Sequence, residues 1–480
     1  MARGPGAGLG RHASVRPGPA RGAAHAGALL ARWLRHAGDA RARAARVPPP
    51  EALVLLHRGC AADTHAPLSR ASTIGPVTSP RIAVLGAGIV GTAIAYELRK
   101  RGADVALVDR DEPGNGCSFG NSGAISVSSV APLAMPGVLA SVPSMLLDPE
   151  SPLRLPLRYL PRAAPWLLQF VASARPHRVE QAAKQLAALH AGAVDMHEAM
   201  ARELGVPGLF LRRGHLHLYI DDASLAKDAG AWRLREAHGV RAERLDRAGI
   251  EALEPDAPAR YQVAMFLADH ATIVEPFRYV QAMARAFAAN GGRVVQADVQ
   301  RLESRAGGWT LRGAAGEPFT HAIVAAGAWS NQLVAPLGIH LALESQRGYH
   351  VQYTDVRDVV SRTVVLTDRK VFVTPMEGGL RVGGTVEIAG LRAPPDPTRA
   401  AVLDRIAREA FPALEGRATT TWMGHRPCMP NSVPVVGTVS NHPGLWIATG
   451  HGHLGLTDSL PTARRIADAL LGEGVAGRGA

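Results

Sequence analysis

Three glycines and one aspartate stand at the spacing of a turn that binds a dinucleotide. Gly86, Gly88 and Gly91 lie in the run GAGIVG, and Asp109 stands 23 residues after Gly86. The first glycine permits a tight turn, the second lets the backbone approach a pyrophosphate, and the third lets a helix and a strand pack closely. A carboxylate at this distance accepts hydrogen bonds from both ribose hydroxyls and repels a 2′-phosphate. The pattern predicts a site for an adenine dinucleotide.

The elements around these residues have the order that such a site needs. Ile82–Leu85 and Val105–Val108 are short apolar runs that predict two buried strands. Between them, Ile94 and Leu98 stand four residues apart, as they would on one face of a helix. The N-terminus of that helix would offer free N–H groups and a positive dipole end to the phosphates. Because the glycines stand between two strands, the motif is far more specific than a lone glycine run.

The net charge of +12 is concentrated in the first part of the chain. Residues 1–80 hold 11 arginines, no lysine and three acidic residues, which leaves +8. Residues 81–480 hold 42 basic and 38 acidic residues, which leaves +4. A body with so balanced a charge lacks the basic patch that nucleic-acid binding needs. We therefore expect no nucleic-acid partner.

Cysteine spacing and hydropathy exclude two further classes of protein. No two of the three cysteines, Cys60, Cys117 and Cys428, are separated by only two residues, which excludes a zinc ribbon or a thioredoxin-type motif. No metal site is predicted. No uninterrupted apolar run approaches the about 20 residues that span a membrane. A hydrophobic content of 47% is typical of a globular protein, and we expect a cytoplasmic location.

Residues 1–78 are rich in alanine, arginine, glycine and proline and are predicted to be a disordered, low-complexity extension. Their arginine-rich, acid-poor composition superficially fits a mitochondrial transit peptide. The other interpretation is a mis-assigned start, because the chain has 49 arginines and only four lysines, as a GC-rich coding strand would produce. We hypothesise that translation starts at Val77, which would place the first strand at the N-terminus.

Three further segments favour FAD over NAD as the dinucleotide. Residues 116–125 form a loop of small residues that can follow a ligand, and residues 321–330 predict a strand that runs into a glycine. Residues 445–457 predict a strand and a glycine loop, which a helix follows over about 457–471. The positive end of that helix would stabilise an anionic reduced flavin, which a nicotinamide enzyme does not require.

At this point the chain resembles a known family. The motifs that carry the resemblance are RIAVLGAGIVG, CSFGNSGAIS, VAAGAWS, RGYH, PMEGGLRVGGT, HRPCMPNSVPVVG and GHGHLGLT. They occur in the order found in the D-amino acid dehydrogenases, which belong to the D-amino acid oxidase-like flavoproteins together with glycine and sarcosine oxidases. The resemblance covers about residues 80–475 and implies noncovalent FAD.

The resemblance also implies an α/β fold with two discontinuous domains. A Rossmann-type FAD-binding domain would carry a mixed-sheet (α+β) substrate domain. The FAD-binding domain is expected at 79–165, 270–336 and 421–475, and the substrate domain at 166–269 and 337–420. Within the substrate domain, we expect helices in 180–203 and strands at 215–220, 349–353, 371–374 and 380–385.

By position, the resemblance places the family's cofactor contacts on one set of residues. They are Gly86, Gly88, Ile89, Gly91, Asp109, Arg110, Ser118, Asn121, Gly123, Val299, Gly327, Gly450, Gly452, Leu454, Gly455, Leu456 and Thr457. Val299 lies in GGRVVQADVQRL, which is expected to be a strand whose backbone holds the adenine.

Arg426 is expected to bind the carboxylate of an amino-acid substrate. A guanidinium fork binds a carboxylate bidentately, which a lysine does less well. The segment WMGHRP around Arg426 is apolar, unlike a solvated surface. The resemblance places the family's substrate arginine here, and the alternative is a structural ion pair.

Three other residues are candidates on the substrate side. Tyr349 would either donate its hydroxyl to the substrate carboxylate or pack in the core, and Arg347 and His350 are expected to face away from it. His451 and His453 flank the glycine of the flavin loop, and at most one of them is expected to touch substrate. The alternative for each is a structural histidine with hydrogen-bonded nitrogens.

The chain departs from the family at one position near the expected site. The family commonly carries aspartate where this chain has Asn431, and an asparagine can cap the same turn without the negative charge of an aspartate.

Residues 127–170 mix apolar residues with Arg154, Arg158 and Arg162. This segment would either rest on the inner membrane, where a quinone takes electrons, or pack on the core as part of the substrate lid.

The sequence therefore predicts an FAD-dependent oxidoreductase that oxidises an amino acid, of D configuration by the resemblance, to a 2-oxo acid and ammonia. The expected partners are the amino acid and an electron acceptor, which is a quinone, another carrier or oxygen. One alternative is a secondary-amine oxidase or dehydrogenase of the sarcosine, glycine or hydroxyproline type. An NAD-dependent dehydrogenase and a non-catalytic flavin-binding protein are the others.

Overall fold

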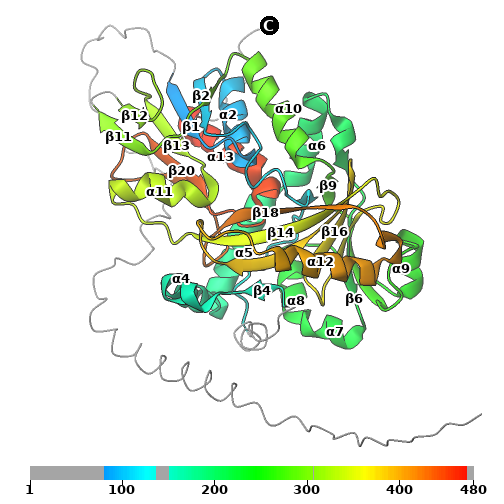
Figure 1. Ribbon diagram of the computed structural model, residues 1–480. Coiled ribbons are helices and arrows are strands. Elements are labelled where there is room, and N and C mark those ends of the chain that lie inside the picture. Colours follow the sequence, from blue (N-terminus) through cyan, green and yellow to red (C-terminus); the bar gives the residue numbers. More distant parts are fainter. Residues whose placement is uncertain (1–79, 137–150, 306–307, 473–480) are drawn as a thin grey trace, which may run out of the picture. The chain divides into compact units, whose positions relative to one another are not determined.

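The first predicted strand lies at the centre of a mostly parallel sheet (Figure 1). The computed structural model describes residues 80–136, 151–305 and 308–472, all within one compact unit, Thr73–Ala480. Strand β1 (Arg81–Leu85) pairs in parallel with β2 (Asp104–Asp109) and β13 (His321–Val324). The sheet continues outward with β10 (Arg293–Gln296) beside β2, and with β20 (Leu445–Thr449) and then β19 (Val435–Thr438) beside β13. Only β19 and β20 pair antiparallel.

Both faces of this six-stranded sheet are covered, which explains why its strands are almost continuously apolar. One core cluster joins the sheet to four helices, which are α2 (Ile89–Lys100), α6 (Ala193–Glu203), α10 (Pro276–Ala289) and α13 (Gly455–Leu471). A second cluster joins the opposite face to the hairpin of β11 (Arg301–Arg305) and β12 (Gly308–Arg312) and to α11 (Ser330–Val334). Figure 1 shows the hairpin and α11 together on this side.

A second sheet of nine strands is mixed, as the sequence predicted for the substrate domain. Only two of its strand pairs are parallel, β6 with β15 and β4 with β17. In order, the strands are β18 (Thr419–Cys428), β14 (Glu344–Thr354), β17 (Gly379–Ile388), β16 (Val371–Met376), β15 (Thr363–Leu366), β6 (His215–Tyr219), β8 (Val263–Leu267) and β7 (Glu243–Leu245), with β4 (Leu153–Arg154) beside β17. Helix α12 (Pro397–Ala410) packs on the sheet through a separate core cluster.

The remaining elements surround the two large sheets. The helices are α4 (Leu160–Ser173), α5 (Pro176–His190), α7 (Asp222–Lys227), α8 (Ala229–Ala237) and α9 (Arg247–Leu253). A small sheet joins β3 (Ala124–Ile125), β9 (Ala271–Ile273) and β5 (Phe210–Leu211). No helix in the described ranges is long and apolar enough to cross a bilayer.

Most predicted elements are present, with two differences. The helices predicted in 180–203 are α5 and α6, which are separated where Gly192 adopts a left-handed conformation (φ 73°). The strand predicted at 349–353 extends over Glu344–Thr354. Val299 is not in a strand: β10 ends at Gln296, and residues 297–300 connect it to β11.

The domain boundaries stay a prediction. One observation bears on them, since residues 421–428, assigned above to the FAD-binding domain, form part of β18 in the nine-stranded sheet. The predicted disordered extension, residues 1–78, and the proposed start at Val77 lie outside the described residues.

Candidate active site

A cavity of about 480 Å³ opens at the carboxyl ends of β1, β2, β13 and β20. Open parallel sheets bind their ligands at this edge, at the point where the strand order reverses. Twelve of the predicted cofactor residues line it, namely Gly86, Gly88, Ile89, Asp109, Arg110, Ser118, Asn121, Val299, Gly327, Gly452, Gly455 and Leu456. These residues come from five separate stretches of the chain, which the parallel sheet brings together.

The glycine turn between β1 and α2 leaves no room for a side chain at Gly86 or at Gly91. Gly86 adopts a φ of 106°, and a Cβ atom there would lie 2.4 Å from the carbonyl oxygen of Ala325. At Gly91, a Cβ atom would lie 1.8 Å from the carbonyl oxygen of Gly86. Gly88 precedes α2, and no side chain of its own caps the helix. Instead, the Ile89 N–H donates to Ser118 Oγ at 2.9 Å, so that the predicted loop residue orients the helix N-terminus.

The carboxylate of Asp109 is held at the end of β2. Its Oδ2 accepts a hydrogen bond from the Ala87 N–H at 2.6 Å, and its Oδ1 accepts one from the Asp111 N–H at 3.1 Å. Each carboxylate oxygen has a second lone pair, which leaves acceptor capacity for the two hydroxyls of a ribose. The helix N-terminus, the bare glycine backbone and this fixed carboxylate together fit the adenosine diphosphate part of FAD.

Helix α13 directs its N-terminus at the same cavity. Leu454 precedes the helix without a side-chain cap, and Gly455 and Leu456 line the cavity. Thr457 does not line it but anchors the helix, because its Oγ1 accepts the Ser126 N–H at 3.0 Å. The free N–H groups and positive dipole end of α13 suit the N1–C2=O edge of a flavin, which becomes negative on reduction.

Four other predicted cofactor residues lie behind the lining rather than in it. Gly91 packs α2 against the turn, and Leu454 precedes α13. Gly123 and Gly450 have positive φ, and Cβ atoms there would lie 2.1 Å from the Ile273 carbonyl oxygen and 2.5 Å from Met429 Cγ. These residues shape the loops that form the cavity.

The loop of residues 116–125 is fixed by the nine-stranded sheet. His350 on β14 donates from Nδ1 to the Gly120 carbonyl at 3.0 Å, and Arg381 on β17 donates to the Asn121 carbonyl at 2.5 Å. The Trp422 ring covers Gly120 so closely that a Cβ atom there would lie 2.1 Å from it. The motifs RGYH and GGLRVGGT therefore act on the cofactor loop from the opposite sheet.

Arg426 on β18 is a half-buried cation without a carboxylate partner among the described residues. Its Nη1 donates to the Thr385 carbonyl at 2.8 Å, and its Nη2 lies 3.5 Å from the Gly384 carbonyl. Burial lowers the pKa of the guanidinium, but an arginine stays charged at neutral pH. The next residue, Pro427, lines the cavity. No carboxylate among the described residues pairs with Arg426, so the alternative of a structural ion pair is not supported.

Tyr349 lies on the other face of β14 from the cofactor loop. Its hydroxyl donates to Glu387 Oε2 at 2.6 Å and accepts the Asp396 N–H at 2.9 Å. With both groups satisfied, Tyr349 is placed in the core beside α12 rather than at the cavity. His350 faces away from it as expected, but the expectation for Arg347 is wrong, because residues two apart on a strand share a face and Arg347 also binds Glu387.

The two histidines of the flavin loop have different surroundings. His451 is buried and lines the cavity, and its Nε2 hydrogen-bonds to Thr462 Oγ1 at 3.0 Å. His453 is exposed, and no hydrogen bond of its ring is recorded among the described residues. Desolvation lowers the pKa of the buried His451 to about 4. The His451 imidazole is therefore neutral at pH 7.

Two groups at the site contain residues that the sequence analysis did not single out, among them Trp329 and His425 in the first group. The Arg110 guanidinium lies over the Trp329 ring, 4.8 Å from its centroid, and Trp329 meets His425 edge-on at 5.1 Å. All three line the cavity. Trp329 belongs to the motif VAAGAWS. The motif alone does not show that the Trp329 ring contacts His425 on β18 of the other large sheet.

The second group is a buried pair beneath the first turn of α13. His190 Nδ1 lies 2.7 Å from Asp458 Oδ1, and both side chains are buried. Asp458 Oδ2 has no hydrogen-bond partner. Because His190 is on α5, this pair ties the cofactor helix to the helical layer beside it. No sequence motif joins residues so far apart.

Asn431 forms the turn that its residue type predicts. Its Oδ1 accepts the Val433 N–H at 3.1 Å, and Ser432 adopts a φ of 65°. The asparagine thus caps the turn without adding a negative charge near the cavity.

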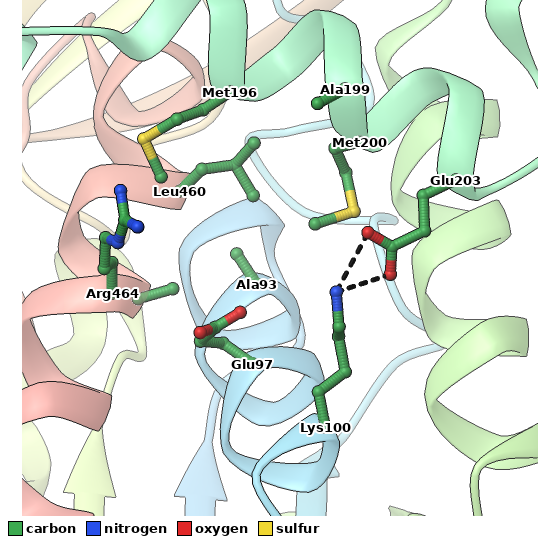
Figure 2. A pocket seen from close by; sticks show the side chains of 10 residues that line it. Ala93, Glu97, Lys100, Met196, Ala199, Met200, Glu203, Leu460 and Arg464 are labelled. Carbon is green, nitrogen blue, oxygen red and sulfur yellow. Dashed lines mark hydrogen bonds and ion pairs between the residues drawn. The ribbon is translucent and has the colours of Figure 1, made fainter. Parts of the chain in front are cut away.

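A second cavity, of about 320 Å³, lies between α2, α6 and α13 (Figure 2). Apolar side chains such as Met196, Met200 and Leu460 line it, and an ion pair between Lys100 Nζ and Glu203 closes one side at 2.7 Å. It has neither a glycine turn nor an uncapped helix end, so it does not fit a dinucleotide. Within the described ranges, no three His, Cys, Asp or Glu residues are grouped as a metal site would require.

Comparison with known proteins agrees with this geometry. Residues 81–469 match the family model described as FAD dependent oxidoreductase. A D-amino-acid oxidase of Bradyrhizobium diazoefficiens is 37% identical over 403 residues, which cover 82% of this chain and 95% of the relative. D-amino acid dehydrogenase 2 of Ralstonia nicotianae is 35% identical, with 81% of this chain and 96% of the relative covered.

Solved structures share the fold at low identity. Glycine oxidase from Geobacillus kaustophilus superposes with a TM-score of 0.62 at 20% identity, over 83% of this chain and 96% of that structure. Iminodiacetate oxidase from Chelativorans has a TM-score of 0.62 at 22% identity, over 83% and 97%. The fold, the glycine turn with its acidic partner and the family match give one result: the chain belongs to the FAD-dependent oxidoreductase family of D-amino acid oxidase type.

Proposed function

We propose that this protein catalyses the oxidative deamination of a D-amino acid to its 2-oxo acid and ammonia. Relatives above 30% identity that cover most of the chain include proteins named D-amino acid oxidase and D-amino acid dehydrogenase. The observation that carries the proposal within this chain is the unpaired guanidinium of Arg426, one residue from the cavity lining.

Arg426 supports an acidic substrate because of what surrounds it. Its two recorded acceptors are neutral carbonyl oxygens, and no carboxylate among the described residues neutralises it. A half-buried cation without a counterion is costly, and a substrate carboxylate would supply the missing charge through a bidentate contact. Its backbone is fixed by pairing with β14, at Gln346.

The reaction needs little proton transfer from the protein. The substrate reacts with its amine neutral, after the ammonium group has lost a proton to solvent. The Cα–H bond then breaks, the hydrogen leaves with its electron pair, and the amine lone pair forms the C=N bond of a protonated imino acid. When bound, FAD supplies the acceptor for that hydride. Water then adds to the imino carbon and ammonia leaves. The role of the chain is to hold the carboxylate and to aim the Cα–H bond.

Of the two loop histidines, we propose that His453 faces the substrate amine. His451 is already bonded to Thr462, whereas the His453 ring is exposed and free of recorded partners. An imidazole is largely neutral at pH 7, so His453 accepts a hydrogen bond from the substrate amine without repelling it. Tyr349, with its hydroxyl bound to Glu387, is not part of this proposal.

The electrons must then reach an acceptor, which we propose to be a quinone or another carrier, with oxygen as the alternative. The names of the relatives include both oxidase and dehydrogenase. Reduction of a soluble quinone analogue and consumption of oxygen, measured with the same substrate, separate the two.

Product analysis tests the proposed reaction. The holoenzyme is incubated with D-amino acids, L-amino acids, glycine and sarcosine, with an artificial acceptor that takes two electrons. The proposal predicts one 2-oxo acid and one ammonia for each acceptor molecule reduced, from D-amino acids only. Turnover of sarcosine or glycine in preference would favour the secondary-amine alternative, whose fold the solved glycine and iminodiacetate oxidases share.

A further inference from the structure

Asp458 places a carboxylate in the turn of α13 whose positive end lies at the flavin cavity. Gly455 and Leu456 of the same turn line that cavity, whereas Asp458 is buried and does not line it. Its Oδ2 has no hydrogen-bond partner among the described residues. A negative charge at this position stabilises the helix, but it also offsets the positive potential that the helix end offers to a reduced, anionic flavin. The cofactor helix therefore needs a cation close to Asp458.

His190 on α5 is the residue that faces this carboxylate. Its Nδ1 lies 2.7 Å from Asp458 Oδ1, and its Nε2 lies 3.4 Å from the Ser129 carbonyl oxygen. A carbonyl oxygen and an ionised carboxylate only accept hydrogen bonds, so each side of the imidazole ring presents a proton. A separation of 2.7 Å between nitrogen and oxygen is typical of a charge-assisted hydrogen bond. The pair as a whole therefore holds an added proton and carries no net charge.

His197 provides a comparison, because it also contacts the first turn of α13. Its Nε2 lies 2.9 Å from the Leu456 carbonyl oxygen, and its Nδ1 lies 3.1 Å from the Tyr279 hydroxyl. The hydroxyl can donate, so one ring proton satisfies both contacts, and desolvation lowers the pKa of His197 to about 4. His197 thus holds the helix as a neutral ring. Of these two buried histidines, only His190 faces a carboxylate, and only His190 needs the second proton.

Two other basic side chains near Asp458 do not replace His190. Arg465, two turns later in α13, is exposed, and its Nη2 donates to the Ala188 carbonyl at 2.6 Å. His451 bonds to Thr462 instead, and desolvation lowers its pKa to about 4. Among the described residues, His190 is therefore the one that can neutralise Asp458 by direct contact.

We propose that His190 is a positioning residue whose positive charge cancels that of Asp458 and so preserves the positive end of α13 for the flavin. Neither residue lines the cavity, so neither would touch the cofactor. Asp458 ties α13 to α5, and the proton of His190 removes the electrostatic cost of that attachment. When bound, FAD accepts the hydride, and a nearby charge changes its reduction potential. The role of His190 concerns the cofactor and is independent of the proposed substrate.

The midpoint potential of the bound flavin tests this role. The full-length holoenzyme is reduced anaerobically with dithionite in the presence of redox dyes, so that no substrate is involved. For His190→Gln we expect the equilibrium constant for two-electron reduction to fall about tenfold, which lowers the potential by about 30 mV. The glutamine amide keeps a hydrogen-bond donor at this position but leaves the Asp458 charge uncompensated. The double variant His190→Gln, Asp458→Asn should recover the wild-type potential, because both charges are removed.

This recovery separates an effect of charge from a loss of packing, because two losses of packing would not cancel. Two matched variants act as controls. Asp468→Asn removes an acid further along α13, which pairs with Arg101 at 2.6 Å, and His197→Gln removes the neutral histidine that contacts the same turn. Both should keep the wild-type potential. An unchanged potential in His190→Gln, or a double variant with a potential as low as that of His190→Gln, would overturn the proposal.

Asp458→Asn alone keeps the proposal testable if His190→Gln does not fold. This variant removes the carboxylate and leaves His190 free to lose its added proton, so we expect a potential equal to or above that of the wild type. Titration of the apoprotein with FAD should give the wild-type dissociation constant. A lower potential in Asp458→Asn would show that the carboxylate itself supports the flavin, which contradicts the proposal. Bleaching by D-amino acids, measured on the same samples, reports separately on the proposed function.

Discussion

Arg426 owes its position to a glycine on the neighbouring strand. A Cβ atom at Gly348 would lie 2.0 Å from Arg426 Nη2 and 2.1 Å from Cζ. The guanidinium therefore lies flat on β14, with its donors directed to the carbonyls of Thr385 and Gly384. This contact gives the RGYH motif a physical function, because its glycine makes room for the Arg426 guanidinium.

Removing the guanidinium should affect substrate binding and leave the cofactor in place. For Arg426→Ala we expect a normal flavin spectrum and a kcat/KM reduced by about 30- to 1,000-fold, the loss of a charged bidentate contact of roughly 2–4 kcal/mol. Arg426→Lys should retain part of the activity, because it keeps the charge but loses the fork. Steady-state kinetics measure the effect. Unchanged kinetics in the alanine variant would remove Arg426 from the site.

Crowding the arginine should resemble removing it. Gly348→Ala places a methyl group where the guanidinium lies, so we expect KM to rise by about tenfold or more while flavin binding persists. The control is Gly378→Ala, because no atom lies within 4 Å of a Cβ there and its φ is not positive. A Gly348→Ala enzyme with the KM of the wild type would show that Arg426 does not need its present position.

At the scale of single residues, the sequence predicted the cofactor site better than the substrate site. Glycines and Asp109 act through backbone and spacing, which a sequence records directly. The choice between a core and a substrate-binding position for Tyr349 depends on its hydrogen bond to Glu387, which is 38 residues away on β17. Trp329 and His190 were missed for the same reason, since their partners His425 and Asp458 lie on distant segments.

Among the elements, the turn between β1 and α2 is the most sensitive to a small change. For Gly91→Ala we expect loss of bound FAD, because the new Cβ would lie 1.8 Å from the Gly86 carbonyl oxygen and would push α2 away from the turn. The ratio of flavin absorbance to protein absorbance measures the loss. Gly230→Ala in α8, where a Cβ meets no atom within 4 Å, should retain FAD fully. Full occupancy in Gly91→Ala would contradict the packing role of this glycine.

Element types and approximate bounds followed from periodicity, whereas strand neighbours did not. The predicted strands around 82–85, 105–108 and 321–324 are adjacent in the sheet. Their adjacency was implied by the family resemblance and not by the apolar periodicity of each strand. The strand predicted through Val299 was wrong, because GGRVVQADVQRL spans β10, a connection and the start of β11. Tertiary pairing ends β10 at Gln296 and begins β11 at Arg301, so that one mixed polar and apolar stretch contributes to two strands.

At the scale of the whole molecule, buried neutral histidines link stability to pH. The Ser128 N–H donates to His270 Nε2 at 3.1 Å, and His215 Nε2 lies 2.9 Å from the Ala271 carbonyl. The two Nδ1 atoms are 2.9 Å apart, so His270 donates and His215 accepts, with both rings neutral. Desolvation lowers the pKa of His215 to about 4 and also lowers that of His270. His197 and His451 have pKa values near 4 for the same reason.

Acid should therefore unfold the protein well before its carboxylates are protonated. The unfolded chain binds protons at histidine from about pH 6.5 downward, whereas the folded protein excludes them until about pH 4 at His215. The free energy of unfolding should be constant above about pH 6.5 and fall between about pH 6.5 and 4, by up to roughly 3 kcal/mol per buried histidine. Urea unfolding at several pH values measures this. Equal stability at both ends of the window would show that these histidines take up protons in the fold.

The central claim is that this flavoprotein takes its electrons from D-amino acids. Its most direct test is anaerobic: the visible spectrum of the full-length protein is recorded while D-amino acids, L-amino acids, glycine, sarcosine and hydroxyproline isomers are added separately. We expect the oxidised flavin band to bleach with D-amino acids in the wild type, and only at much higher concentration in Arg426→Ala. Bleaching by secondary amines alone, or a protein that remains colourless when FAD is supplied, would contradict this account.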